Sequence, residues 1–155
     1  MLPVLLPLVT GSLLLLTSRL AEGLRRAVGF AATLALLPIA LLLMSQVADG
    51  SHVVYALGAW QPPFGIVLVA DRLSALMLLL TAIVALASQV YAGDGQDTAG
   101  PQFQALFQFQ LLGINGAFLT GDLFNLFVFF EVLLIVVALR ALRETGSDHV
   151  DGGQR

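Results

Sequence analysis

Residues 118–136 read FLTGDLFNLFVFFEVLLIV and are the most informative part of the sequence. Its apolar residues are interrupted by a short polar turn at residues 120–122, which predicts the end of one membrane helix and the start of another. A single acid, Glu131, lies roughly 13 Å further along the second helix than Asp122. It therefore falls near the centre of a hydrocarbon core about 30 Å thick, where charged side chains are rare and mark candidate functional sites.

Two roles for Glu131 follow from this position. It could carry a proton or pair with a cation on a helix outside this chain, since the chain has no Lys and Arg140 lies on the opposite face of the same helix. It could instead be a protonated, hydrogen-bonded side chain that only holds helices together. We favour the first role, because carboxylates at the membrane centre usually belong to ion or proton pathways.

The composition is that of an integral membrane protein. The chain is 58% hydrophobic and only 11% charged, which leaves too little polar surface for a soluble domain of 155 residues. It contains no Cys, so disulfides and thiolate metal sites are excluded. The two His residues, His52 and His149, lie outside the apolar runs, and we expect neither a metal site nor a cofactor.

Five apolar runs predict an all-α integral membrane protein with five transmembrane helices. The expected spans are residues 2–18, 27–47, 66–91, 103–120 and 122–142, with Leu73 as an alternative start for the third. Between the second and third spans, the strand-like residues 53–60 and the Pro-rich residues 62–65 predict a short extracytoplasmic hairpin, with Tyr55 and Trp60 at headgroup depth. Residues 143–155 are expected to form a polar, disordered cytoplasmic tail.

The arginines predict the orientation. The first basic residue, Arg19, follows the first apolar run instead of preceding it, which argues against a cleavable signal peptide. With the N-terminus outside and the C-terminus inside, six of the seven arginines are cytoplasmic: Arg19, Arg25, Arg26, Arg140, Arg143 and Arg155. This N-out/C-in arrangement is the one that the positive-inside rule favours.

The fourth span carries a polar stripe. Gln104, Gln108 and Asn115 fall within about 40° of one another on a helical wheel. They could line a hydrated path or hydrogen-bond to a neighbouring helix, and composition slightly favours packing. Asp122 is expected to cap the fifth helix, with a pathway role as the alternative, and Asn125 could lie in the same hydrated mouth or end the turn.

A longer motif points to a known family. Residues 107–135, FQFQLLGINGAFLTGDLFNLFVFFEVLLI, resemble the fourth and fifth helices of the D subunit of Mrp-type monovalent cation/proton antiporters, which is related to the antiporter-like membrane subunits of respiratory complex I. Residues 57–60, LGAW, and 65–77, GIVLVADRLSALM, resemble the hairpin and third helix of the same family. The resemblance implies the N-terminal third of such a protein, and the divergence after Ile135 suggests a frameshift, a premature stop or a split gene.

The resemblance also implies a function. The acid matching Glu131 pairs in that family with a Lys on a broken seventh helix and relays protons. We therefore expect a subunit of a multi-subunit antiporter in a bacterial-type inner membrane, with Na⁺ as the expected cation and other membrane subunits as partners. Two alternatives remain: a proton-pumping subunit fragment of a complex I-type oxidoreductase or membrane hydrogenase, and a non-transporting assembly scaffold.

Overall fold

The fold is mostly helical, as the sequence predicts. The computed structural model describes residues 1–17, 21–56, 66–93 and 102–151, with side chains described as far as residue 142. In chain order the elements are α1 (Leu2–Leu16), α2 (Glu22–Gln46), β1 (Val53–Ala56), β2 (Val67–Ala70), α3 (Arg72–Gly93), α4 (Phe103–Leu119) and α5 (Leu123–Asp151).

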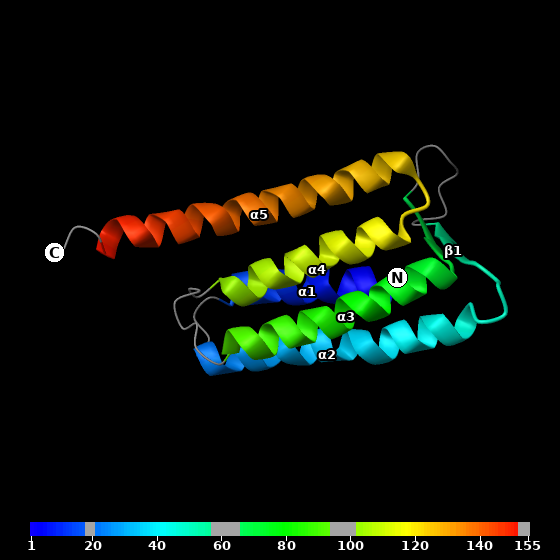
Figure 1. Ribbon diagram of the computed structural model, residues 1–155, viewed down its shortest axis with the longest axis horizontal. Coiled ribbons are helices and arrows are strands. Elements are labelled where there is room, and N and C mark those ends of the chain that lie inside the picture. Colours follow the sequence, from blue (N-terminus) through cyan, green and yellow to red (C-terminus); the bar gives the residue numbers. More distant parts are fainter. Residues whose placement is uncertain (18–20, 57–65, 94–101, 152–155) are drawn as a thin grey trace.

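The helices run alternately in opposite directions (Figure 1). The N-terminus, the strands and the turn between α4 and α5 gather at one end. The C-terminal end of α1, the start of α2, the end of α3 and the start of α4 gather at the other end (Figure 1). Helix α4 contacts all four other helices, and α5 packs against α4 at the edge of the bundle. The α4–α5 pair therefore carries one exposed flank of the molecule.

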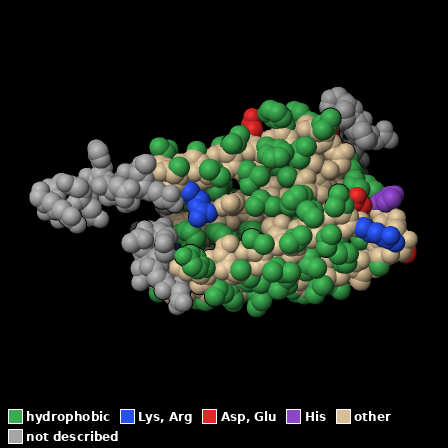
Figure 2. All heavy atoms as spheres, viewed as in Figure 1, with side chains coloured by type: hydrophobic (Ala, Val, Ile, Leu, Met, Phe, Trp, Pro, Cys, Tyr) green, Lys and Arg blue, Asp and Glu red, His purple; other side chains and the backbone are tan. Residues whose placement is uncertain are grey.

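Three of the helices are long and apolar enough to cross a membrane. These are α2, the first 21 residues of α3, and α5 over its first 20 residues. Helices α1 and α4 contain 15 and 17 residues, fewer than the ~20 that usually span a hydrocarbon core. Apolar side chains are spread across the whole face shown in Figure 2, with only isolated charged groups among them, and many large ones are exposed. Such a surface is typical of a multi-pass membrane protein, because exposed apolar side chains are stable against lipid tails but unfavourable in water.

The strands correct the predicted start of the third span. Residues 67–70 form β2, which pairs antiparallel with β1, so the predicted start at residue 66 is wrong. The alternative start at Leu73 lies one residue after the first residue of α3, Arg72. The helix begins only after Asp71, whose Oδ1 accepts a hydrogen bond from the Ser74 N–H at 2.7 Å. Tyr55 is half exposed in β1, and the predicted interfacial Trp60 lies outside the described residues.

Asp71 and Arg72, adjacent at the start of α3, make separate contacts. The Arg72 Nε donates to the Val47 carbonyl at 3.2 Å, and its Nη2 donates to the Ala48 carbonyl. The hydrogen bond from the Ser74 N–H lowers the pKa of the Asp71 carboxyl below its usual value. Together these contacts tie the end of α2 to the start of α3.

Helix α5 is longer than the sequence predicts. It continues to Asp151, beyond residue 142, where we expected a disordered tail to begin. Residues 141–148 contain neither Pro nor an adjacent pair of helix breakers, and their single Gly146 weakens a helix without ending it. The polar composition of residues 143–151 therefore does not mark the end of the helix.

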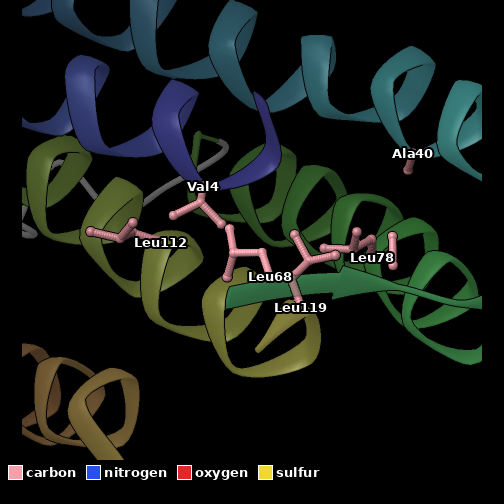
Figure 3. Close-up of a cluster of buried hydrophobic side chains, with 7 residues drawn as sticks. Val4, Ala40, Leu68, Leu78, Leu112 and Leu119 are labelled. Atoms are coloured by element: carbon pink, nitrogen blue, oxygen red, sulfur yellow. The ribbon is translucent and has the colours of Figure 1, made fainter. Parts of the chain in front are cut away.

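The largest group of buried apolar side chains joins four helices and β2. It comprises Val4, Ala40, Leu68, Ala70, Leu78, Leu112 and Leu119. Figure 3 shows Val4 of α1, Leu68 of β2 and Leu119 of α4 converging at its centre. A second group, in which Leu36 and Ala82 meet Phe107, lies between α2, α3 and α4. The core thus belongs to α1–α4, and α5 is added to its outside.

Candidate functional site

Helix α5 starts from a fixed turn. The Gly121 N–H donates to the Val67 carbonyl at 2.9 Å, which joins the turn to β2. Asp122 Oδ1 accepts the Phe124 N–H at 3.1 Å, and its Oδ2 accepts the Asn125 side-chain amide at 3.4 Å. An acid that bonds the second N–H of a helix satisfies one of the orphan donors of the first turn and meets the positive end of the dipole. Asp122 therefore caps α5, and Asn125 is buried beside it.

Two glycines of α4 let α5 approach closely. The ring of Phe129 lies directly over Gly116, where a Cβ would overlap three ring atoms. One turn along α4, a Cβ on Gly113 would lie 2.7 Å from Leu133 Cγ, closer than packing permits. The cap and these two contacts determine which face of α5 turns toward the bundle, and therefore which face turns away from it.

Glu131 lies on the face that turns away. It is two residues after Phe129, or about 200° around the helix, and its side chain is exposed. Its helical neighbours on that face are large and apolar, with Phe127 69% and Leu134 67% exposed. Among the residues that the structure describes, none forms a hydrogen bond or ion pair with Glu131. The carboxyl thus lies on an apolar surface without a partner among the described residues.

Arg140 is directed elsewhere. Its Nη1 donates to Gln110 Oε1 on α4 at 2.7 Å, and its guanidinium carbon lies 5.1 Å from the centre of the Phe103 ring. Because these contacts hold Arg140 against α4, its guanidinium does not neutralise the charge of the Glu131 carboxylate. The sequence pattern missed Gln110, which lies outside the polar stripe of α4.

The polar stripe faces the other helices. Gln108 Nε2 donates to the Gly29 carbonyl at 2.9 Å and to Thr33 Oγ1 at 3.1 Å, both on α2. Asn115 Nδ2 donates to the Pro3 carbonyl of α1 at 2.9 Å. Both side chains are almost completely buried, so these hydrogen bonds join α4 to α2 and α1. The stripe is therefore turned toward α1 and α2, and Glu131 is on a different helix and surface.

Gln104, the third residue of the stripe, joins α4 to α3 through Gln89, a residue that the sequence pattern did not identify. Its Oε1 accepts the side-chain amide of Gln89 from α3 at 3.3 Å. Gln89 is an amide in an apolar span, which is the signal that could have identified it. The Oε1 atoms of Gln89 and Gln108 and the Oδ1 of Asn115 are buried without a protein donor. Each leaves an acceptor that a water molecule could satisfy.

Within the described ranges, no three His, Cys, Asp or Glu side chains gather closely enough to hold a metal ion. The candidate site is therefore a lone carboxyl on a rigidly positioned helix. Such a group can bind and release a proton, or pair with a cation brought against the same surface.

Comparison with known proteins gives clear relatives. No family model matches the chain. It is 48% identical over 157 residues to the D subunit of a probable K⁺/H⁺ antiporter of Rhizobium meliloti, a match that covers 98% of this chain and 29% of that protein. It is 42% identical over 136 residues to the D subunit of a Na⁺/H⁺ antiporter of Alkalihalophilus pseudofirmus, covering 86% and 27%. The N subunit of an NADH-quinone oxidoreductase of Desulforudis audaxviator is 37% identical over 134 residues, covering 83% and 27%.

Solved structures agree with these relatives. A chain of the Mrp complex from Dietzia sp. superposes with a TM-score of 0.79 at 38% identity, covering 87% of this chain and 25% of that one. A chain of the membrane-bound sulfane sulfur reductase, an archaeal respiratory membrane complex, superposes with a TM-score of 0.80 at 30% identity, covering 87% and 28%. The chain therefore spans between a quarter and a third of the length of the proteins it matches.

Proposed function

Because this chain is homologous to part of the D subunit of the Mrp-type cation/proton antiporters, we propose that it acts as a membrane subunit, or a portion of one, in a multi-subunit antiporter. The observation that carries the proposal is the position of Glu131, which is exposed on the outer apolar face of α5 and has no partner in the part of the chain that the structure describes. In this proposal Glu131 takes up and releases the transported proton.

A bare carboxylate is unfavourable at the centre of a membrane. A charge at the membrane centre costs at least ~2.5 kcal/mol on insertion scales, so an ionised Glu131 needs water or a cation nearby. The described part of the bundle supplies no cation, since Arg140 bonds to α4. We propose that a Lys on a helix outside this chain faces Glu131, in the part of the longer relatives that this chain does not span. Approach of that cation would favour the ionised acid, and its withdrawal would favour the protonated acid.

We further propose five membrane spans with the N-terminus outside and the C-terminus inside. The alternating helix directions support this proposal, since they place the arginine-bearing ends of α2 and α5 together (Figure 1). Arg25 and Arg140 come from those ends, and the positive-inside rule places such residues in the cytoplasm. The bacterial origin of the related antiporter proteins supports an inner-membrane location.

A second function has specific support. The likeness to the N subunit of an oxidoreductase and to a chain of a respiratory complex is compatible with a proton-translocating role driven by electron transfer. The two proposals differ in the driving force, which is the proton gradient coupled to cation export in the first and a reductant in the second. The cation itself is open, because one related antiporter is named for K⁺ and another for Na⁺.

The test uses the complete complex in everted membrane vesicles, with an acridine dye reporting the proton gradient. Addition of NaCl or KCl should collapse the gradient if cations exchange for protons. Glu131→Gln should slow that exchange by about 100-fold, the lower range for loss of a proton-transferring group, and Glu131→Asp should retain part of it. The matched control is Glu22→Gln, which removes an exposed acid at the start of α2.

The outcomes separate the functions. If both variants assemble and Glu131→Gln exchanges cations as fast as the unaltered complex, Glu131 carries no proton and the scaffold role is favoured. If only an electron donor, and no cation, drives Glu131-dependent proton movement, the redox-driven alternative replaces the antiporter.

A further inference from the structure

A groove runs between α3 and α4 on the outside of the bundle. Its volume is about 330 Å³, and its walls extend from Met77 to Ser88 on α3 and from Phe107 to Phe118 on α4. The lining is mainly apolar, with two hydroxyls and the Gln110 amide as its polar groups. The groove belongs to different helices from Glu131, so the proposed proton site leaves it unexplained.

The groove matches one leaflet of a bilayer in length. Eleven residue steps along either wall correspond to about 16 Å. Half of a hydrocarbon core of ~30 Å is ~15 Å, which is the depth of a lipid tail. A single extended hydrocarbon chain of one leaflet therefore matches the length and the apolar lining of the groove.

A guanidinium lies at one end of the groove. Gln110, which lines it, accepts the hydrogen bond from Arg140 Nη1 at 2.7 Å. A second route gives the same position, because the Phe107 ring in the wall stacks on Phe103 at 6.0 Å and Arg140 lies over Phe103. Arginine has five N–H donors, and Gln110 accepts from one nitrogen, so others can bind a phosphate oxygen.

We propose that this groove binds an acyl chain of an anionic phospholipid, whose phosphate is bound by Arg140. The apolar walls recognise the tail and the guanidinium recognises the headgroup. The choice of leaflet rests on the proposed topology, in which Arg140 lies at the cytoplasmic end, where anionic lipids are attracted by basic residues. The binding itself does not depend on antiport, so it stands or fails separately from the role of Glu131.

The experiment is native mass spectrometry of the delipidated 155-residue chain, titrated with dioleoylphosphatidylglycerol or with zwitterionic dioleoylphosphatidylcholine. We expect one tightly bound phosphatidylglycerol and weaker phosphatidylcholine. Arg140→Gln should weaken phosphatidylglycerol binding about fivefold, the effect of one basic residue at a membrane surface, whereas Arg140→Lys should keep most of it. Arg143→Gln is the control matched in charge and helix. Ser88→Trp, at an exposed groove position, should weaken binding of both lipids.

Three results would overturn the proposal. One is equal binding of the two lipids by the unaltered chain. Another is an equal effect of Arg140→Gln and Arg143→Gln on phosphatidylglycerol binding. That result would mean that the lipid is attracted by the net positive charge of the chain and not by Arg140 specifically. The third is unchanged binding in Ser88→Trp, which would place the lipid elsewhere. Circular dichroism of each variant checks that its helices are intact.

Discussion

The close approach of α5 to α4 makes a quantitative prediction about Gly116. Gly116→Ala adds a Cβ that overlaps the Phe129 ring, and overpacking of this kind costs about 1–3 kcal/mol. Replacing Gly by Ala within a helix recovers about 1 kcal/mol of helix propensity. The control is Gly23→Ala in α2, because a Cβ there meets no atom within 4 Å and only the propensity gain applies. Gly116→Ala should therefore be about 1–3 kcal/mol less stable than Gly23→Ala.

The assay is reversible unfolding of the chain in mixed micelles with increasing sodium dodecyl sulfate, followed by circular dichroism. A double-mutant cycle with Phe129→Leu isolates the contact, since the smaller side chain leaves room for the new methyl group. We expect a coupling free energy of about 0.5–3 kcal/mol between the two substitutions. Additivity within about 0.3–0.5 kcal/mol would refute the contact, and equal stabilities of the two Gly→Ala variants would refute the packing that positions α5.

Two further predictions concern the ends of helices. Asp122→Ala should lower the free energy of unfolding by about 0.5–2 kcal/mol, because it removes the α5 cap. Asp122→Asn should lower it much less, since Asn can also cap a helix. Equal losses of stability in the two variants, measured by the same unfolding assay, would contradict capping. Asp71 has a folded pKa below its unfolded value of about 3.9, so its contribution to stability is present above about pH 3.9 and is lost as pH falls through the folded pKa. Below about pH 4, Asp71→Asn should therefore lose less stability than the unaltered chain does, as measured by unfolding titrations across pH. The same fall in stability below about pH 4 in both chains would contradict this role of Asp71.

The sequence predicts the helices well and their ends less well. Apolar length alone locates five helices, because each must bury its backbone polar groups. It fails at residues 67–70, whose apolar side chains continue directly into α3 and look helical. Only pairing with β1 makes them a strand, and that pairing is a long-range contact. The prediction is also wrong beyond residue 142, where α5 continues to Asp151. The polar side chains there indicate that the helix leaves the apolar region, and they do not indicate that the helix ends.

The site shows the same division. Periodicity places Gln104, Gln108 and Asn115 on one face of α4, but it does not say which helices that face meets; the structure gives α1, α2 and α3. Glu131 stands out in the sequence because one acid among apolar residues is conspicuous. The sequence does not predict that Glu131 faces outward, because this direction depends on the packing of Phe129 and Leu133 of α5 against Gly116 and Gly113 of α4.

We propose that, in the assembled complex, the face of α5 bearing Glu131 meets a hydrated partner surface and not lipid. These 155 residues contain no Cys, so Glu131→Cys introduces the one thiol among them, and its reaction with a small hydrophilic methanethiosulfonate can be timed against the unaltered complex in membranes. Leu41→Cys, at an exposed apolar position on α2, is the lipid-facing comparison. We predict fast hydrophilic modification at position 131 and little at position 41. Equal resistance of both thiols, with reaction only toward a lipophilic maleimide, would place Glu131 against lipid and contradict the proposed proton site.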